Sequence, residues 1–379
     1  MKTVLAFDSF KGSLTAAQVV SAVSDAIRHV HHDAEIVALP LADGGEGTAE
    51  ALCRCTDATW VECAAHDALM RPITARYAIS RDRRTAIMEM AEAAGLTLLA
   101  ETERNPMRTT TVGVGEMMKD AIERGARHII IGIGGSATND CGMGMLTALG
   151  AVCRDACGNV LPPIGANMTR LGCMDWSRLL LPHDLTIEVV CDVSNPLFGT
   201  DGAAHVYARQ KGASEAEVQH LDAGLRHMAA TLHTSPVTGQ AIDANGSGCG
   251  AAGGLGYALL LLGARLRRGV DVVLDAAHID SQLLNADLCM TGEGRIDSQT
   301  LNGKLPYGVL LRAQKHGVPV MAFAGAAADC PMLQAAGFSS ITAITPPTLA
   351  LSQAMRPDVA TRLLRQAVTT ALLTQSHSL

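Results

Sequence analysis

Aromatic and charged side chains are both scarce in this sequence. Among its 379 residues, aromatic residues make up 3% and charged residues 18%, whereas apolar residues make up 48%. A disordered chain has low hydrophobicity and high charge, so this composition excludes one. The core must be built from Ala, Leu, Val and Ile, with 16 Met as fillers. The length is too great for one small core and predicts two or three cooperating units.

Long basic runs and long apolar runs are missing as well. The net charge of −7 argues against a nucleic-acid partner, because neutralising phosphates takes a basic patch. Arg265, Arg267 and Arg268 come nearest to such a patch, and we interpret them as a solvated turn that complements the dipole of a preceding helix. The longest apolar stretch, 255–264, is too short to cross a bilayer, so no membrane partner is expected. The opening apolar segment is too short for a signal peptide, and we expect a soluble cytoplasmic protein.

Several motifs of known chemistry are absent. The 11 cysteines are odd in number and lack the paired CxxC spacing of a zinc site, so they are interpreted as reduced core residues. HExxH and GxSxG do not occur, which leaves zinc peptidase and serine hydrolase chemistry without support. There is no Walker A loop. A nicotinamide-dependent dehydrogenase is disfavoured because no GxGxxG fingerprint follows the first predicted strand.

The hydrophobic pattern predicts an α/β protein. Apolar runs predict strands at 4–7 and 36–41, and the helix between them begins with a Thr15–Gln18 capping box. This βαβ unit implies parallel strands and a right-handed crossover. Further strands are predicted at 74–79, 86–90, 128–133, 187–191, 286–290 and 318–323, with helices at 143–149, 306–317 and 359–373. The middle of the chain differs in texture from its ends, which predicts an inserted domain with a more mixed sheet.

Polar, glycine-rich segments follow five predicted strands, where open parallel sheets bind their ligands. They lie at 8–13, 43–48, 132–140, 191–196 and 291–304. Gly134, Gly135 and Ser136 predict an anion site at the N-terminus of the next helix, although a plain tight turn is the alternative. The six glycines within 246–256 indicate either a loop that closes on a ligand, which we favour, or a close helix contact.

These segments hold the residue types that phosphoryl transfer needs, namely cations for the developing charge and carboxylates for Mg²⁺ and for the attacking hydroxyl. The lysines are Lys11, Lys211 and Lys304, and the acids are Asp8, Asp43, Asp192, Glu293 and Asp297. The alternative for each lysine is a solvated side chain. The alternative for each acid is a helix N-cap or a salt bridge.

With these motifs the sequence resembles the bacterial glycerate kinase family, of the D-glycerate 2-kinase type, over essentially its whole length. The matching segments are 8–13, 42–48, 132–140, 191–196, 210–213, 250–254 and 291–300. The sequence departs from the family pattern at Phe7, at Cys141 and at 245–247. Cys141 puts the phosphate cradle in doubt, because a glycine-dependent backbone angle cannot be assumed there.

The resemblance implies a Rossmann-like parallel-sheet domain formed by both chain ends, with a second α/β domain of mixed sheet inserted. We expect the first domain at 1–62 with 286–379 and the second at 63–285, with the active site in the interdomain cleft. The resemblance further implies ATP and Mg²⁺ as cofactors, and D-glycerate and 2-phosphoglycerate as substrate and product. The expected partners are glycerate and ATP, and a homo-oligomer is left open.

We assign expected site roles to residues of these segments and to Lys304. The expected catalytic residues are Lys11, as a charge stabiliser, Asp192, as the acid that orients the C2 hydroxyl, Asp43 and Asp8. The expected ATP-binding residues are Gly134, Gly135, Ser136, Thr138, Asn139 and Lys211. The expected substrate-binding residues are Ser9, Ser13, Arg295 and Lys304, and those for Mg²⁺ are Glu293 and Asp297.

Two alternatives remain at this stage. One is a two-domain protein that closes on a small organic acid without chemistry, and the other is a kinase that gives 3-phosphoglycerate. The division of roles among the five acids is also left open.

Overall fold

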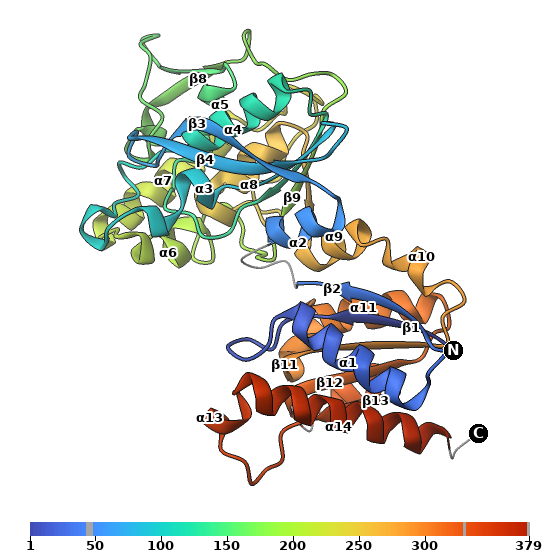
Figure 1. The fold of residues 1–379 in the computed structure, drawn as a ribbon. Coiled ribbons are helices and arrows are strands. Elements are labelled where there is room, and N and C mark those ends of the chain that lie inside the picture. Colours follow the sequence, from blue (N-terminus) through green and yellow to red (C-terminus); the bar gives the residue numbers. More distant parts are fainter. Residues whose placement is uncertain (43–47, 329–330, 377–379) are drawn as a thin grey trace. The chain divides into compact units, whose positions relative to one another are not determined.

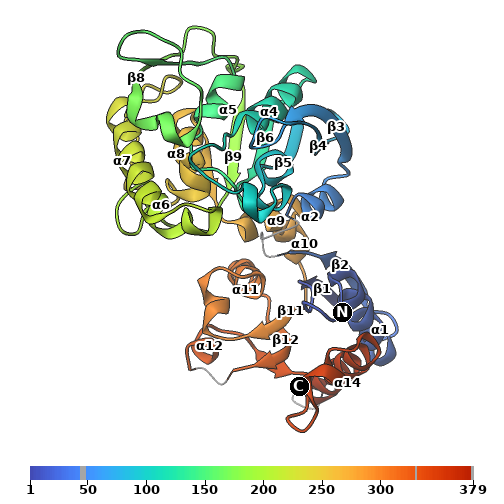
Figure 2. The same cartoon turned by 90° about the vertical axis from the view of Figure 1, so that its left-hand side faces the viewer.

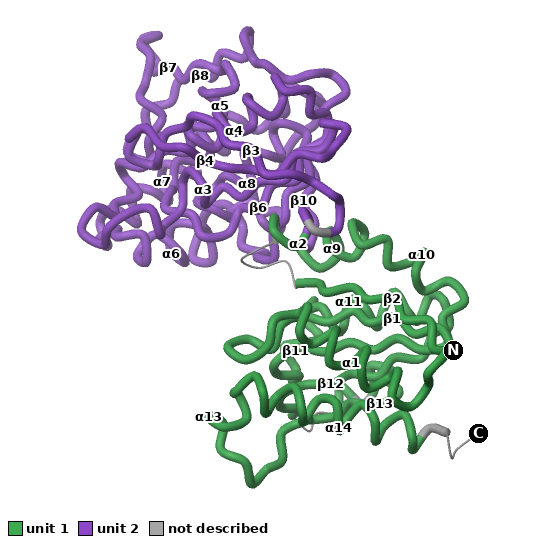
Figure 3. Tube along the Cα trace, viewed as in Figure 1, with its two compact units in different colours: residues 1–51, 269–379 green, residues 52–268 purple. Residues whose placement is uncertain are grey.

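The chain forms two compact units in a computed structural model, which describes residues 1–42, 48–328 and 331–376. Unit 1 consists of residues 1–51 and 269–379, and unit 2 consists of residues 52–268 (Figure 3). The two chain ends therefore share one unit and the middle of the chain forms the other. The domain limits expected from the sequence stay a prediction, because a compact unit of the structure is not thereby shown to fold as an independent domain.

Unit 1 is built on a parallel sheet of five strands in the order β13-β12-β11-β1-β2. Its strands are β1 (Lys2–Phe7), β2 (Glu35–Pro40), β11 (Leu288–Ile296), β12 (Val320–Ala327) and β13 (Ser340–Ala343). Strand β1 pairs in parallel with the edge strand β2 on one side and with the central strand β11 on the other. The parallel βαβ arrangement predicted for the start of the chain is thereby confirmed.

Helices cover both faces of this sheet. They are α1 (Ala16–Val30), α9 (Gly269–Ala276), α10 (Ile279–Leu283), α11 (Leu305–Lys315), α12 (Pro331–Ala335), α13 (Leu351–Ala354) and α14 (Pro357–Ser376), while α2 (Thr48–Cys55) runs into unit 2. Helices α1 and α14 pack together on one face and α11 lies on the other (Figures 1 and 2). The Thr15–Gln18 capping box is present at the start of α1. Val19, Ile27 and Leu364 bury their apolar side chains against Phe7 and Phe323 of the sheet.

Unit 2 holds a mixed sheet of six strands in the order β10-β9-β6-β5-β4-β3. Its strands are β3 (Thr59–His66), β4 (Pro72–Ile79), β5 (Thr85–Glu89), β6 (His128–Gly132), β9 (Thr186–Val190) and β10 (Arg265–Arg267), and β7 (Val152–Asp155) and β8 (Leu171–Asp175) form a separate hairpin. Strands β3 and β4 are antiparallel to their neighbours, whereas β5, β6, β9 and β10 are mutually parallel. The expected mixed sheet is therefore confirmed.

Helices of unit 2 pack around this sheet and around the hairpin. They are α3 (Ala91–Ala94), α4 (Val112–Glu123), α5 (Met143–Ala148), α6 (Ala203–Tyr207), α7 (Glu215–Thr231) and α8 (Ala251–Leu261). None of the helices in the described part of the chain is long and apolar enough to cross a membrane.

The interpretation of Arg265, Arg267 and Arg268 as a solvated turn is wrong. Arg265–Arg267 is strand β10, which pairs with β9. Arg267 forms an ion pair of 2.8 Å with Glu188 of that strand. The three residues were mistaken for a turn because β10 is a short edge strand that alternates two arginines with one leucine.

Candidate functional site

A cavity of about 420 Å³ opens in unit 1 at the carboxyl ends of β1, β11 and β12. Many of the residues predicted from the sequence line it, namely Asp8, Ser9, Lys11, Ser13, Glu293, Arg295 and Lys304. Two sequence segments almost 300 residues apart are brought together because β1 and β11 are neighbours, with Phe7 opposite Gly292. The expectation that strand-end motifs meet at one edge of a parallel sheet is met for these two motifs.

The topology of the sheet explains the position of this cavity. From β1 the chain moves to β2 on one side, whereas from β11 it moves to β12 and β13 on the other side. The order of the strands therefore reverses between β1 and β11. Open α/β sheets bind ligands outside the carboxyl ends of their strands at such a reversal.

The segment that follows β1 forms a tight turn beside the cavity. Asp8 is buried, its main-chain N–H donates to the carbonyl of Gly292, and its Oδ1 accepts the N–H of Ser9 at 2.6 Å. Gly12 has a φ of +75°, a left-handed conformation that glycine adopts without strain. Lys11 at the tip of the turn is exposed and is free to reach an anion in the cavity.

Glu293 lies in β11 with a cation beside it. Its carboxylate accepts hydrogen bonds from Thr300 Oγ1 at 2.7 Å and from Lys304 Nζ at 3.1 Å. Lys304 precedes the first turn of α11, so the ion pair links the strand to the helix that follows it. Sequence reasoning named Glu293 and Lys304 separately but did not foresee this pair or the contribution of Thr300.

Asp297 performs the alternative role considered for the acids. It is the N-cap of the short helix Ser298–Asn302, where its Oδ1 accepts the N–H of Gln299 at 3.0 Å. Its Oδ2 accepts from Arg295 Nε at 3.1 Å, and Asp297 does not line the cavity. These two bonds hold the Asp297 carboxylate against the helix N-terminus and Arg295.

The two acids expected for Mg²⁺ do not form an open metal site. Lys304 forms an ion pair with Glu293, and Arg295 forms one with Asp297. A basic side chain that is paired with a carboxylate repels a metal ion at the same carboxylate. Within residues 1–42, 48–328 and 331–376, no group of three or more His, Cys, Asp or Glu residues is placed to hold a metal ion. The donor set therefore does not fit a magnesium ion held by the protein alone.

The predicted end of the strand at residue 290 is wrong, and so is the predicted end at residue 323. Strand β11 continues to Ile296 and β12 continues to Ala327, so the Thr291–Ile296 segment belongs to the sheet. The glycines here provide close packing and not a loop. A Cβ on Gly292 would lie 1.9 Å from the carbonyl oxygen of Phe323 in the neighbouring strand.

A second group of predicted residues gathers around Lys211 in unit 2. Lys211 is buried, and its Nζ donates to Ser136 Oγ and to the carbonyl oxygen of Thr138, both at 2.7 Å. Burial lowers the pKa of Lys211 from 10.5 to about 7, and the nearby Asp140 acts in the opposite direction. The hydroxyl of Thr138 and both amide atoms of Asn139 are buried without a hydrogen-bond partner among the described residues.

The predicted helix start next to Gly134, Gly135 and Ser136 is wrong, whereas anion binding by these residues stays a prediction. Helix α5 begins at Met143, well beyond Gly134 and Ser136. Its first amides are already occupied, because Asp140 accepts the N–H groups of Gly142 at 3.0 Å and Gly144 at 3.1 Å. Burial raises the pKa of Asp140, and these hydrogen bonds together with those from Thr111 counteract the rise.

Within 246–256, Gly253 and Gly254 form the close helix contact, whereas Gly246, Gly248 and Gly250 precede the helix, so a loop that closes on a ligand stays a prediction for that part. Helix α8 includes Gly253 and Gly254, both buried and both with positive φ. A Cβ on Gly253 would lie 2.2 Å from the carbonyl oxygen of Thr138. Helix α8 therefore packs closely against the backbone of Thr138 and Asn139 at Gly253.

The expected catalytic acid Asp192 lies outside both groups, and the structure does not describe Asp43. Asp192 follows β9 in unit 2 and its side chain is exposed. Asp43 falls outside the described residues, as do Gly44 to Gly47 of the same motif. The geometry therefore leaves the roles of Asp192 and Asp43 as predictions.

Sequence reasoning missed the apolar wall of the unit 1 cavity. This wall consists of Ile344, Leu351, Ala354, Met355 and Ala360, which come from the segment after β13 and from the start of α14. Such residues carry no chemical signature. The only signal was the exposure of large apolar side chains, since Leu351 is 72% exposed.

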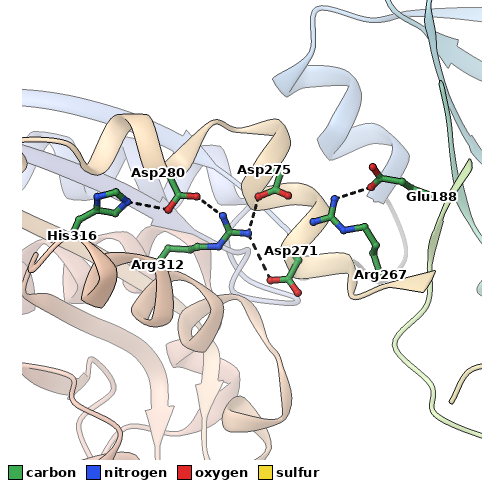
Figure 4. A network of polar contacts seen from close by, with 7 residues as sticks. All are labelled: Glu188, Arg267, Asp271, Asp275, Asp280, Arg312 and His316. Atoms are coloured by element: carbon green, nitrogen blue, oxygen red, sulfur yellow. Dashed lines mark hydrogen bonds and ion pairs between the residues drawn. The ribbon is translucent and has the colours of Figure 1, made fainter. Parts of the chain in front are cut away.

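A network of ion pairs in unit 1 lies apart from the cavity lining. Arg312 of α11 pairs with Asp275 at 2.7 Å, with Asp271 at 3.9 Å and with Asp280, and Asp280 also contacts His316 (Figure 4). These contacts fasten α9 and α10 to α11. We assign the network to the stability of unit 1.

Comparisons with known proteins agree along the whole chain. The sequence model of the Glycerate kinase family matches residues 3–375. A protein named Glycerate 2-kinase from Escherichia coli (strain K12) is 43% identical over 332 residues, which is 87% of this chain and 86% of that protein. A Glycerate kinase from Bacillus cereus is 40% identical over 363 residues, covering 94% of this chain and 93% of the relative.

A solved structure gives the same result. The crystal structure described as glycerate kinase 2 from Salmonella typhimurium LT2 matches with a TM-score of 0.84 at 41% sequence identity. The match covers 100% of this chain and 100% of that chain.

Proposed function

Since the chain belongs to the Glycerate kinase family, we propose that it transfers the γ-phosphoryl group of ATP to D-glycerate, giving 2-phosphoglycerate and ADP. The 2-position is supported by the name of the E. coli relative, Glycerate 2-kinase. ATP as the donor supports the cytoplasm as the place of the reaction.

One structural observation supports this proposal independently of the family match. Asp8, Lys11, Glu293, Arg295 and Lys304 come from distant segments and line one cavity at the reversal point of the unit 1 sheet. Cations in such a position stabilise charge that develops on a transferring phosphoryl group.

The proposed roles follow from exposure and contacts. Exposed Lys11 neutralises charge on the transferred group, because its side chain has freedom to follow that group. Asp192 orients the attacking hydroxyl of glycerate, and its exposure leaves its carboxylate accessible to substrate. Asp8 is held by the N–H of Ser9 and positions the turn that carries Lys11.

Magnesium enters this scheme with the nucleotide. ATP carries Mg²⁺ on its phosphates as the substrate complex. Since Glu293 and Asp297 are each bonded to a basic side chain, we derive no step from a metal held by these residues.

A coupled assay tests the proposed function. Purified protein is mixed with ATP, Mg²⁺ and D-glycerate, and the formation of ADP is followed. We expect ADP formation that depends on D-glycerate and on Mg²⁺. Binding of glycerate without ADP formation would support the non-catalytic alternative instead.

A further inference from the structure

We propose that the unit 1 cavity is the nucleotide site, with the adenine against its apolar wall and the phosphates toward Lys11, Arg295 and Lys304. This inference rests on the proposed function for the identity of the donor, ATP. It reverses the assignment expected from the sequence, which placed ATP at Gly134 to Asn139 with Lys211 and placed glycerate at Ser9, Ser13, Arg295 and Lys304.

The size of the cavity favours a nucleotide. Sites for drug-sized ligands have volumes of about 300–1,000 Å³. The cavity of about 420 Å³ falls within that range. Glycerate is a three-carbon acid and would fill only a small part of it, and a site much larger than its ligand leaves most of the polar contacts unmade.

The cavity is lined by both apolar and cationic side chains. Ile344, Leu351 and Met355 have no charge and suit a flat apolar base. Lys11, Arg295 and Lys304 carry positive charge and suit an anion. A nucleotide has this same division between base and phosphates, whereas glycerate is polar throughout.

The apolar wall and the turn that carries Lys11 lie close together. A Cβ on Gly12, in the turn that carries Lys11, would lie 2.8 Å from Cε of Met355. The turn after β1 and the apolar wall therefore form one continuous site. The absence of a side chain at Gly12 keeps the wall and the turn this close.

The Lys211 group lacks comparable features. Lys211, Thr138 and Asn139 are all buried, and Nζ of Lys211 already donates to two oxygens. Its remaining N–H, with the unpartnered groups of Thr138 and Asn139, suits a compact polar ligand better than a base.

Titration calorimetry with ADP, in the absence of glycerate, tests the assignment. Met355→Glu places a negative charge against the base and the phosphates, and Met355 is 37% exposed, so its substitution spares the core. We expect the Kd for ADP to rise at least tenfold. The matched control is Met332→Glu, at an exposed Met of unit 1 that does not line the cavity, and its Kd should stay within twofold of the wild-type value.

Lys211→Met separates the two assignments. If the nucleotide binds in the cavity, this variant keeps its affinity for ADP. Loss of ADP binding in Lys211→Met, with unchanged binding in Met355→Glu, would overturn the inference and restore the assignment expected from the sequence.

Photolabelling of the wild-type protein with 8-azido-ATP gives a second readout that requires no variant. We expect the label within 344–360, and a label within 134–140 would overturn the inference. The outcome is independent of turnover. ADP binding in the cavity without glycerate phosphorylation would refute the proposed function alone, whereas turnover with unchanged ADP affinity in Met355→Glu would refute this inference alone.

Discussion

At the scale of single residues, two aspartates of unit 2 that follow β6 and β9 have opposite environments. Asp140 is buried and accepts hydrogen bonds from Thr111, Gly142 and Gly144. Asp192 is exposed. Burial therefore separates an acid that stabilises the fold from one that is accessible to substrate.

Asp192→Asn should therefore affect activity and leave stability almost unchanged. We expect kcat to fall about 100-fold or more, because an amide does not orient or deprotonate the attacking hydroxyl. The free energy of unfolding should change by less than about 0.5 kcal/mol, as for other surface substitutions. Steady-state ADP formation and urea unfolding measure the two effects, and retained turnover would remove Asp192 from the mechanism.

Asp140→Asn is the matched control for that variant. It leaves buried N–H donors facing an amide group, so we expect a loss of about 2–4 kcal/mol in the free energy of unfolding. Equal stability of the two variants would show that the burial of Asp140 has no energetic consequence.

Lys211 makes stability depend on pH in a defined direction. Its pKa is about 7 in the folded protein and 10.5 as the ordinary value, because burial disfavours the charged form. Between these values the unfolded chain binds more protons than the folded protein, so the free energy of unfolding rises with pH. The contribution is fully present above pH 10.5 and is lost as the pH falls through 7.

Urea unfolding of wild type and Lys211→Met at pH 7, 8 and 9 measures this effect. We expect the stability of wild type relative to the variant to rise by up to about 1.4 kcal/mol per pH unit. Parallel pH profiles for the two proteins would show that Lys211 keeps its ordinary pKa.

At the scale of helices and strands, local sequence patterns were sufficient to predict an element whose limits depend on its own residues. The capping box of Thr15 and Gln18 and the apolar face of Val19, Val23 and Ile27 specify α1 without help from the rest of the chain. The limits of β11 could not be predicted in this way. Glycines usually end strands, but β1 pairs with β11 as far as Gly292, and β12 continues the ladder to Ile296.

The close contact between Gly253 of helix α8 and the backbone of Thr138 can be tested by substitution. Gly253→Ala should lower the free energy of unfolding by about 2–5 kcal/mol, because its φ of +67° disfavours a side chain and the new Cβ would overlap Thr138. Denaturant unfolding measures the loss.

Gly239→Ala isolates the contribution of the backbone conformation. Gly239 has a φ of +70° and nothing lies within 4 Å of the position of a Cβ. We expect a loss of only about 1 kcal/mol. Equal losses at the two glycines would contradict the packing of α8 against the Thr138 backbone.

At the scale of the whole molecule, several residues to which the sequence assigned different roles line the same cavity. Asp8, Lys11, Glu293 and Lys304 meet in one cavity because a parallel sheet brings the ends of β1 and β11 together, a rule that sequence patterns can anticipate. The apolar wall around Met355 could not be anticipated, since its residues look like any others in a helix. Asp297 turned out to cap a helix, a role decided by only a few atoms of local geometry.

The most direct measurement of the central claim is the phosphorus NMR spectrum of one reaction tube holding the protein, MgATP and D-glycerate. Transfer to the C2 hydroxyl gives a phosphate coupled to a single carbon-bound proton, so the account predicts a new doublet that grows as ATP is converted to ADP. A triplet would place the phosphate on the C3 methylene carbon and contradict the proposed position. A spectrum in which ATP persists and no phosphoglycerate appears would contradict the proposed function itself.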